Sequence, residues 1–403
     1  MSLMPVADAL AAILADAAPL VEEWVPLASG HRRVLARDLA ATRTQPPLPM
    51  SAMDGYAIRA ADAALPGTRL TVIGEVAAGR PAEQRLEAGE AMRIFTGGVV
   101  PDGADSVVIQ EDTTRDGDTV ILNVPSRPGH HIRAAGIDFH EGDVLLRAGT
   151  RLSDRDLALA ASMNHAKLPL RRRPKIAMLA TGDELVMPGT CPGPGQILYA
   201  NGFALHALAR DEGADTVDLG IAADTLESTT AAIRRARELG VDILVTTGGA
   251  SAGDHDMVLR SLEAEGVAMS FWKIAMRPGK PMMHGTLGGL RVIGLPGNPV
   301  SSYVCAFLFL VPLIRALSGR RDVAHVGESA VLGRAIGGND GREDYLRASL
   351  DYDSMGRLVA TPVERQDSSL LSQLASAQAL VIRPPCAPAA DVGAPCRIIK
   401  LPL

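Results

Sequence analysis

The sequence predicts a multidomain protein that combines an open, mostly parallel α/β sheet with separate β-rich parts. Three observations predict this fold class. Strand-like and helix-like runs alternate between residues 175 and 317, which is typical of βαβ units. Short β-prone runs separated by Gly, Pro and Asp fill residues 51–149, and similar runs fill residues 329–403. The length of 403 residues leaves room for two to four domains.

The composition supports buried cores and argues against several classes of function. Hydrophobic residues make up 47% of the chain and charged residues 21%, so a broadly disordered chain is excluded. The net charge of -6 argues against a basic nucleic-acid-binding surface. Aromatic residues make up 3%, which argues against stacking surfaces for single-stranded nucleic acid. We therefore expect no nucleic acid among the partners.

Cysteine usage and the apolar segments indicate a cytoplasmic protein. The four cysteines fit no disulfide scaffold or zinc module, and we expect each to be a small buried hydrophobe: Cys191, Cys305, Cys386 and Cys396. The first five residues lack the features of a signal peptide. The longest apolar run, 303–317, contains Pro312 and is expected to be too short to span a bilayer. We expect no membrane partner.

The N-terminal part is predicted to be helical and to be interrupted by a β-rich insertion. The first forty residues are expected to be helical: apolar residues recur at helical spacing at positions 6, 10, 13 and 14, Pro19 stops this pattern, and a second helix is expected over 31–40. Ser153, with Asp156 three residues later, predicts the start of another helix that runs toward Met163. Domain bounds follow from these runs: 1–44 with 150–172 as the helical part, and 45–149 as the β-rich insertion.

The rest of the chain divides into an α/β domain and a small β domain. We assign residues 173–318 to the α/β domain and residues 328–403 to the C-terminal domain. Strands are expected over 175–180, 216–219, 241–246 and 291–295. Helices are expected over 201–212, 224–239, 257–265 and 299–317.

Three loops of the α/β domain carry the residue types of a binding site. Ligands bind beyond the carboxyl ends of parallel strands, and the loops that follow these strands are 181–184, 247–256 and 296–302. All three contain glycine together with hydroxyl or carboxylate side chains. They favour a phosphate-bearing or pterin-like ligand.

The glycine-rich loop and the acidic residues each allow two interpretations. The glycines of 248–253 let backbone N–H groups approach an anion, although an ordinary tight turn would also use them. Asp254 and Asp256 suit a hard cation such as Mg²⁺, or they cap the next helix. Asp224 lies on the ligand side, yet with Glu227 three residues later it is also a candidate helix cap.

A cluster of cations follows in the segment 271–281. Lys273, Arg277 and Lys280 all lie within one stretch of eight residues, although the chain as a whole is acidic. This local positive charge favours an anionic ligand. The alternative is a solvated strand edge. In the insertion, histidines 130, 131 and 140 have no metal-like spacing, and we expect them to be solvated.

Together, six sequence strings resemble the molybdopterin molybdenumtransferase family, which includes the bacterial MoeA type and the E-domain of gephyrin. The strings are SAMDGYA at 51–57, RIFTGG at 93–98, ATGDEL at 180–185, TTGGASAGDHD at 246–256, FWKIAMRPGKP at 271–281 and LPGNPVSS at 295–302. The resemblance covers nearly the whole chain. It implies a helical lever, a β-rich insertion, an α/β domain like that of molybdopterin adenylyltransferases (MogA-like), and a C-terminal β-barrel-like domain.

The resemblance also implies a reaction. Molybdate and adenylylated molybdopterin would be the substrates, molybdenum would be inserted, AMP would be released, and Mg²⁺ would be the cofactor. It implies a cytoplasmic homodimer with a site shared between chains. Transient contacts with molybdopterin adenylyltransferase and with cofactor-accepting molybdoenzymes or chaperones are expected.

Site residues are implied by matching motif. The essential carboxylates would be Glu184, Asp224 and Asp256, and the metal ligands Asp254, Asp256 and Glu184. Molybdate or phosphate would be held by Lys273, Arg277, which stands where some relatives have Lys, and Lys280. The nucleotide cradle and the floor of the site would be formed by Gly182, Asp183, Gly248, Gly249, Ser251, Gly253, Pro296, Gly297, Asn298, Pro299 and Ser301. The insertion would contribute Asp54, Thr96, Arg133 and Asp138, and the C-terminal domain would contribute Ser368.

Two other functions remain as alternatives. A molybdopterin adenylyltransferase would use residues 175–318 and leave the insertion without a purpose. A gephyrin-like non-catalytic scaffold is disfavoured because the chain lacks a fused adenylyltransferase domain and a long disordered linker.

Overall fold

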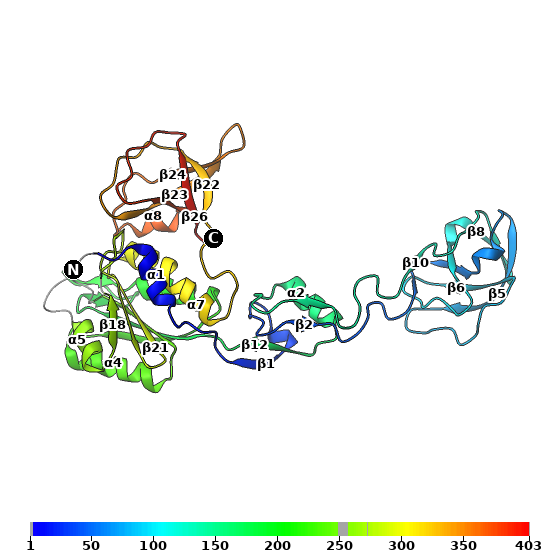
Figure 1. Ribbon diagram of the computed structural model, residues 1–403, viewed down its shortest axis with the longest axis horizontal. Helices are drawn as coiled ribbons and strands as arrows, with labels where there is room; N and C mark the ends of the chain where they lie inside the picture. Colours follow the sequence, from blue (N-terminus) through cyan, green and yellow to red (C-terminus); the bar gives the residue numbers. More distant parts are fainter. Residues whose placement is uncertain (1–2, 249–256, 272, 403) are drawn as a thin grey trace.

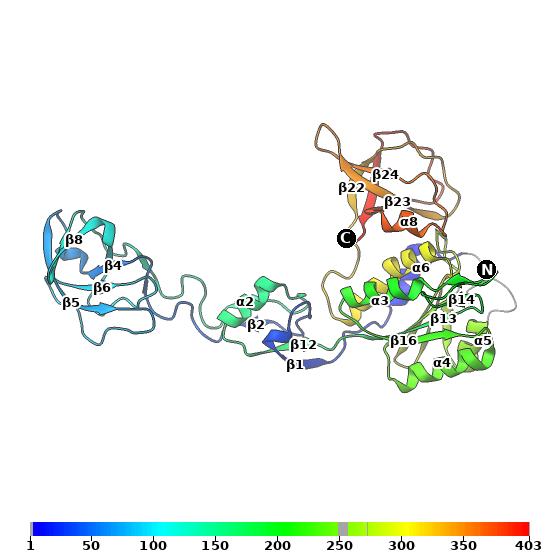
Figure 2. The same ribbon diagram turned by 180° about the vertical axis from the view of Figure 1, so that it is seen from behind.

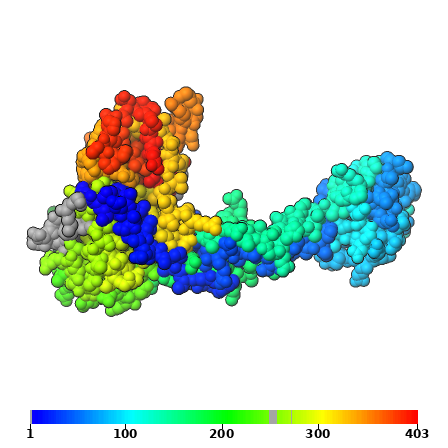
Figure 3. Space-filling view, in the orientation of Figure 1, coloured from blue at the N-terminus to red at the C-terminus, as the bar shows by residue number. Residues whose placement is uncertain are grey.

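The computed structural model describes residues 3–248, 257–271 and 273–402. The molecule is elongated (Figure 1): the α/β and C-terminal domains lie together at one end, the β-rich insertion lies at the other, and a small lever connects them. Two chain segments join the lever to the insertion, one leaving the lever and one returning (Figure 2). The space-filling view shows the same separation of the two ends (Figure 3).

The lever consists of two short antiparallel ribbons and one helix. Its elements are β1 (Glu22–Pro26) paired with β12 (Lys167–Arg171), β2 (Leu39–Ala40) paired with β11 (Val144–Leu146), the 3₁₀ turn η1 (Leu27–Ser29) and α2 (Asp154–Ser162). The predicted capping box of α2 is confirmed. The Asp156 amide donates to Ser153 Oγ at 3.3 Å, and the Ser153 amide donates to the Asp156 carboxylate at 2.8 Å.

The predicted helix over 31–40 is wrong. Val34 and Leu35 instead form isolated β-bridges with Arg151 and Leu170. Both side chains are buried, and Leu35 belongs to the lever core. Val34 and Leu35 are adjacent, and in an extended chain adjacent side chains point to opposite sides. Burial of both therefore fits an extended segment with neighbours on both sides better than it fits the single buried face of a helix. Tertiary pairing therefore overrides the local helical pattern.

The β-rich insertion is confirmed. Its six-stranded sheet has the order β7-β4-β6-β5-β9-β8. The elements are β4 (Gly55–Ile58), η2 (Ala60–Asp62), β5 (Thr68–Val76), β6 (Glu90–Ile94), β7 (Ser106–Ile109), η3 (Gln110–Asp112), β8 (Thr113–Asp116) and β9 (Thr119–Leu122). A short pair, β3 (Met50–Ser51) with β10 (Ile132–Arg133), closes the end that faces the lever.

The α/β domain contains the predicted, mostly parallel sheet in the order β16-β13-β17-β21-β20-β18. The first four of these strands are parallel, and β20 and β18 are antiparallel to their neighbours. The elements are β13 (Lys175–Thr181), β14 (Leu185–Val186), β15 (Ile197–Leu198), α3 (Asn201–Asp211), β16 (Asp215–Ala222), α4 (Leu226–Glu238), β17 (Ile243–Thr247), α5 (Met257–Ala264), β18 (Ala268–Phe271), β20 (Met283–Leu287) and β21 (Leu290–Leu295).

Helices cover both faces of this sheet, so its strands are apolar on both sides. In β13, Ile176 and Met178 contribute to one core, and Ala177 and Leu179 contribute to the other. The second core packs against α4 and α5. The first packs against α3, the long helix described below and α1 (Val6–Leu14). α1 therefore lies on the α/β domain and not in the lever (Figure 1).

A single long helix crosses the first core. It comprises α6 (Pro299–Cys305), a π turn η4 (Ala306–Leu310) and α7 (Val311–Leu317). The π turn lies just before Pro312, which lacks the N–H that an α-helical turn needs. Among the described residues this is one helix that could cross a membrane by length and composition alone, but 83% of its apolar window is buried. Its apolar character is therefore that of a core helix.

The C-terminal domain is a closed barrel of five strands, as the resemblance implied. The order is β23-β24-β22-β26-β25, and β25 also pairs with β23. The elements are β22 (Glu328–Leu332), β23 (Glu343–Tyr352), β24 (Leu358–Pro362), α8 (Leu371–Ala375), β25 (Ala379–Arg383) and β26 (Pro395–Lys400). One more strand, β19 (Met276–Arg277), comes from the α/β domain and pairs with β23.

The cysteine prediction is partly wrong. All four thiols are free, as expected, and Cys305 is buried. Cys191 and Cys386 are exposed, and Cys396 is half-buried. Both exposed thiols lie in loops, where no core is available to cover a small apolar side chain.

Candidate active site

Three loops meet at the carboxyl edge of the parallel strands. The strands β13, β17 and β21 are neighbours in the sheet. A Cβ atom on Gly248 would lie 2.2 Å from the carbonyl oxygen of Thr181, and a Cβ atom on Gly297 would lie 3.7 Å from Gly248 Cα. Gly248 also has a φ of +89°, which other residues rarely adopt. The glycine is what allows the loops that follow the three strands to approach so closely.

Carboxylates of the loop after β13 lie beside a carboxylate of a fourth loop, which follows β16. The Glu184 side chain turns back over its own loop, because a Cβ atom on Gly182 would lie 2.7 Å from Glu184 Oε2. Asp183 Oδ1 accepts a hydrogen bond of 3.1 Å from the backbone amide of Asp224, which follows β16. The structure therefore brings together Asp183, Glu184 and Asp224.

Burial and the neighbouring carboxylates affect the pKa of Asp224. Partial burial raises the pKa of Asp224, and the negative charges of Asp183 and Glu184 act in the same direction, while a hydrogen bond from the Asp183 backbone opposes both. A cluster that resists ionisation gains stability when a cation approaches. Within the described ranges, no group of three or more His, Cys, Asp or Glu side chains has the geometry of a metal site.

The helix-cap interpretation of Asp224 is wrong. Helix α4 begins at Leu226, and its N-cap is Thr225, whose side chain accepts a hydrogen bond of 3.2 Å from the Ser228 amide. Asp224 lies one residue before the cap and is exposed. Its carboxylate is therefore available to the site.

The floor of the site joins the α/β domain to the C-terminal domain. Asn201 Nδ2 donates to the carbonyl of Gly297 at 2.7 Å, which holds the loop between β21 and α6. Asn298 Nδ2 donates to Ser368 Oγ at 2.9 Å, and the Val300 amide donates to the Ser368 carbonyl at 3.1 Å. Ser368 is thus placed against the floor by two hydrogen bonds, one to its side chain and one to its backbone carbonyl.

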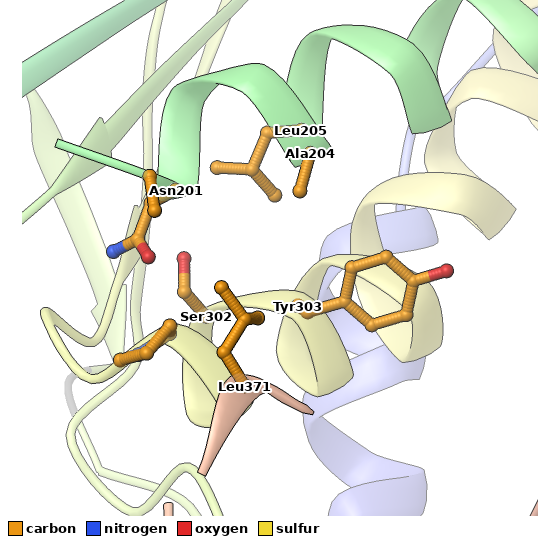
Figure 4. A pocket seen from close by; sticks show the side chains of 8 residues that line it. Asn201, Ala204, Leu205, Ser302, Tyr303 and Leu371 are labelled. Carbon is orange, nitrogen blue, oxygen red and sulfur yellow. The ribbon is translucent and has the colours of Figure 1, made fainter. Parts of the chain in front are cut away.

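The other floor residues hold the loop shape. Pro296 directly follows β21, Pro299 is the first residue of α6, and Ser301 is buried in the first turn. A small hollow lies beside them, between α3, α6 and Leu371 of α8 (Figure 4). The hydroxyl of Ser302 points into this hollow and has no hydrogen-bond partner within the described part of the chain.

Two of the three predicted cations in the loop after β18 are lysines. The chain has only five lysines, and two of them, Lys273 and Lys280, lie in this loop. The Lys273 carbonyl accepts a hydrogen bond of 3.1 Å from the Met4 amide, and the Lys280 carbonyl accepts one of 3.0 Å from the Ile274 amide. The ammonium group of Lys280 is exposed.

Arg277 has a different environment from the two lysines. Its Nη2 donates to Asp340 Oδ2 at 2.8 Å, and its Nε lies 3.9 Å from Asp344 Oδ1. Both carboxylates belong to the C-terminal domain. The structure therefore pairs this guanidinium with protein anions, whereas the resemblance implied that it holds molybdate or phosphate.

The motifs of the insertion converge at the end that faces the lever. Asp54 Oδ1 accepts hydrogen bonds from the amide and the hydroxyl of Thr96, at 2.7 and 2.8 Å, and these bonds lower the pKa of Asp54. The Ser51 carbonyl accepts from the Gly97 amide, and the Ala52 amide donates to the His131 carbonyl. Segments that are distant in sequence are thus held in one surface.

Arg133 and Asp138 flank this surface. Arg133 lies in β10, which pairs with β3, and its side chain is exposed. The Asp138 amide donates to the Gln45 carbonyl at 3.1 Å, where the two connecting segments run together. The lever separates this whole surface from the α/β domain of the same chain (Figure 1). One chain therefore does not bring the two groups of motif residues together.

Five predicted site residues lie outside the described residues: Gly249, Ser251, Gly253, Asp254 and Asp256. Trp272, beside Lys273, does so too.

Sequence reasoning missed two polar side chains. Thr181 Oγ1 is buried where the three loops meet and has no hydrogen-bond partner among the described atoms. Arg347, in β23, is fully buried, and its Nε and Nη1 are likewise unpaired there. Its Nη2 donates to the Arg365 carbonyl at 3.2 Å, next to the loop that carries Ser368. A charged residue inside an apolar strand pattern was the available signal for Arg347.

The fold and the site together define a class of protein. It is a multidomain α/β protein in which glycine and carboxylate loops converge at one edge of an open, mostly parallel sheet, and the sheet domain is joined to a β-rich insertion and a barrel. Family models match three successive parts of the chain: the MoeA N-terminal region (domain I and II) over residues 4–164, a probable molybdopterin binding domain over 177–316, and the MoeA C-terminal region (domain IV) over 329–401.

Relatives match along nearly the full length. A molybdopterin molybdenumtransferase of Haemophilus influenzae is 33% identical over 366 residues, which is 90% of each chain. One of Bacillus subtilis is 34% identical over 370 residues, covering 90% of this chain and 86% of its own. The crystal structure of a molybdopterin biosynthesis MoeA protein from Pyrococcus horikosii covers 99% of both chains with a TM-score of 0.85 and 31% identity. The chain belongs to the molybdopterin molybdenumtransferase (MoeA) family.

Proposed function

We propose that this protein inserts molybdenum from molybdate into adenylylated molybdopterin and releases AMP, as a transferase of molybdenum cofactor biosynthesis. The observation that carries the proposal is the convergence of the β13, β17 and β21 loops with Asp183, Glu184 and Asp224 at one sheet edge. The family match along the whole chain supports it.

The reaction does not need a protein thiolate. Two molybdenum–sulfur bonds to the substrate dithiolene replace two molybdenum–oxygen bonds, and those oxygens leave as water with protons from the dithiol and the solvent. Hydrolysis of the anhydride consumes one water and gives AMP and the pterin phosphate. Burial raises the pKa of the Cys305 thiol far above its usual range, so this thiol is unsuited to metal binding.

The carboxylates provide the anionic half of the site. We assign catalytic roles to Glu184, Asp224 and Asp256, and Asp254, Asp256 and Glu184 would hold Mg²⁺. Carboxylate oxygens are the donors that this cation prefers, and the mutual repulsion at Asp224 is relieved by a positive charge. Bound Mg²⁺ would neutralise charge on the substrate phosphates.

Backbone amides and lysines provide the half that binds anions. Lys273 and Lys280 would attract molybdate or phosphate. The cradle and the floor for the nucleotide would be formed by Gly182, Asp183, Gly248, Gly249, Ser251, Gly253, Pro296, Gly297, Asn298, Pro299, Ser301 and Ser368. The close approach of Gly248 to Thr181, and of Asn298 to Ser368, supports this grouping.

The second group of motif residues would come from another copy of the chain. Asp54, Thr96, Arg133 and Asp138 lie on the insertion, far from the sheet of their own chain (Figure 1). A two-fold homodimer would place them at the partner's sheet and complete two identical sites. We also propose a cytoplasmic location and transient contacts with a molybdopterin adenylyltransferase and with cofactor-accepting molybdoenzymes or chaperones.

A product assay tests the activity. Purified protein with adenylylated molybdopterin and Mg²⁺ should release AMP when molybdate is added. Lys280→Ala should raise the molybdate concentration needed for half-maximal rate about ten- to a hundredfold, because one charge-assisted contact contributes roughly 1.5–3 kcal/mol. Lys400→Ala, which removes a lysine paired with Glu328 in the barrel, is the matched control.

The same assay separates the two enzyme candidates. Release of pyrophosphate from ATP and molybdopterin, with no AMP formed from the adenylylated substrate, would make the protein an adenylyltransferase. The matches to the insertion and the barrel favour the transferase, because an adenylyltransferase would use only the α/β domain. Absence of both products would favour the scaffold.

A further inference from the structure

The loop that carries Lys273 and Lys280 is clamped between two distant parts of the chain. On one side, the Ala275 amide donates to the Met4 carbonyl at 2.7 Å, so the N-terminal segment runs beside the loop. On the other side, β19 pairs with β23, and the Glu343 amide donates to the Ala275 carbonyl at 2.9 Å. The loop is therefore part of the C-terminal sheet as well as of the α/β domain.

The end of the loop near Lys280 has little room to move. A Cβ atom on Gly279 would lie 2.3 Å from Cys305 Sγ in α6, and the glycine has a φ of +115°. The Ile274 amide donates to the Lys280 carbonyl, which closes the loop on itself. Because only two residues lie between Arg277 and Lys280, the position of β19 restricts where the Lys280 backbone can lie.

Asp340, the partner of Arg277, lies in a turn that several other hydrogen bonds hold in place. Asp340 lies in the turn 337–341, where the neighbouring Asn339 donates to the Arg342 and Pro384 carbonyls, at 3.0 and 2.9 Å, and accepts from the Ala387 amide at 2.6 Å. The Asp340 carboxylate also accepts from the Arg342 amide and from Arg342 Nη2. Its two oxygens are thus oriented before they meet Arg277.

An ordinary surface ion pair would have little effect. The Arg277 and Asp340 side chains are 47% and 49% exposed, and exposed pairs add little to stability. This pair differs because both of its ends are anchored and because it joins a strand of one domain to a turn of another. Its effect should therefore appear in the geometry of the loop and not in the stability of the fold.

We propose that Asp340 is a positioning residue that holds Arg277, and through β19 fixes the loop that presents Lys280 to an oxyanion. Arg277 then acts as a structural link between the barrel and the site. The proposal rests on the proposed function only in naming molybdate as the oxyanion. The turn 337–341 thereby becomes part of the active-site scaffold.

The first test measures the loop itself. In full-length protein, hydrogen–deuterium exchange of amides in 274–283 should be faster in Asp340→Asn than in wild type. Asp353→Asn is the matched control, because Asp353 pairs with Arg357 at 2.7 Å in the same barrel, away from β19. Equal exchange in Asp340→Asn and the control would overturn the proposal. This measurement does not depend on the activity.

The second test measures the molybdate response. Asp340→Asn should raise the molybdate concentration for half-maximal AMP release about tenfold, since small displacements of a positioned group have effects of that size. Arg277→Gln should do the same, and the double variant should be no worse than the larger single effect. Additive losses would mean that Arg277 contacts the anion itself and would overturn the link.

Three further outcomes can be distinguished in these experiments. If Asp340→Asn does not fold, Arg277→Gln is measured in both assays with the same expected results. If wild type releases no AMP while the exchange result holds, the proposed function fails and the link stands. If Lys280→Ala alone leaves the molybdate response unchanged, the loop does not present Lys280 to molybdate, and the proposal fails.

Discussion

Asp224 and Thr225 are adjacent residues with separable tasks. Thr225 caps α4, and Asp224 faces the carboxylates Asp183 and Glu184. We expect Asp224→Ala to abolish AMP release and to leave the thermal midpoint within a few degrees, because an exposed site carboxylate contributes little to packing. Thr225→Ala should lower the free energy of unfolding by about 1 kcal/mol and keep the activity. The reverse pattern in activity and thermal unfolding would make Asp224 structural.

His284 predicts a pH dependence of stability. The side chain is 2% exposed in β20, its ring lies 5.7 Å from that of Phe271, and neither ring nitrogen has a partner among the described atoms. Burial, followed by the positive charge of Arg291, lowers the pKa of His284 from 6.5 to about 4. Between these values the unfolded chain binds a proton that the folded chain does not. The stabilising contribution is therefore complete above pH 6.5 and is lost as the pH falls toward 4.

Urea unfolding from pH 7 to pH 4 measures this effect. Wild type should lose stability over the window by up to about 3 kcal/mol from this residue. His284→Phe should fit the apolar site and reduce the slope, and the exposed His31→Gln should leave the slope unchanged. An identical slope in His284→Phe would show that the ring is already accessible to protons.

At the scale of elements, the site depends on how closely the strand ends approach. Gly248→Ala would place a methyl group 2.2 Å from the Thr181 carbonyl at a φ of +89°. We expect the free energy of unfolding to fall by about 3 kcal/mol or more and AMP release to be lost, because the ends of β13 and β17 must separate. Gly288→Ala, at a φ of +58° with no atom within 4 Å, should cost about 1 kcal/mol and keep the activity. Equal behaviour of the two variants in denaturant titration would contradict this account.

The elements that the sequence predicted best are those with buried faces. β17 contains Leu244 and Val245, and an apolar run between turn signals identified it within two residues. β1 escaped prediction because Glu22, Glu23 and Trp24 are not core residues. Its strand character comes from pairing with β12, almost 150 residues away, which leaves no local pattern.

The parts of the site that lie within one loop were predictable from the sequence, and the contacts between distant segments were not. Motifs located the loops after the strands, because glycines and carboxylates at strand ends have a local signature. The contact between Arg277 and Asp340 spans 63 residues and two domains, so no spacing within either motif indicates it. The contact between Asn298 and Ser368 spans 70 residues and was suggested only by resemblance.

At the scale of the molecule, several charged residues lie where the lever meets the α/β domain. Glu212, at the end of α3, accepts hydrogen bonds from Arg315 at 2.8 Å and from Arg320 at 2.6 Å. Arg151, from the lever, donates to the carbonyl of the adjacent Asp211. Arg172 forms two hydrogen bonds with Asp242, at 3.0 and 2.8 Å. The Arg151 and Arg172 contacts join the lever to the α/β domain, and the insertion lies at a distance from its own sheet (Figure 1).

This separation leads to a complementation experiment. In the proposed homodimer, Asp54→Ala and Asp224→Ala should each be inactive, because each would damage one half of both shared sites. After dissociation and reassociation of a mixture, a mixed dimer should have one doubly damaged site and one intact site. Random pairing makes about half of the dimers mixed, so AMP release should recover to roughly a quarter of the wild-type rate.

The control pairs two variants on the same half of the site. Asp54→Ala mixed with Thr96→Ala should stay inactive, because both residues lie on the insertion and every site in a mixed dimer then carries one defect. Mass spectrometry of differently labelled chains would show that exchange occurs. If exchange takes place and the first mixture also stays inactive, each chain must build its site alone. The chain would then have to bend where the lever meets the α/β domain, so that the insertion reaches its own sheet. Arg151 contacts the Asp211 carbonyl at this junction, so substitution of Arg151 would then change the rate of AMP release.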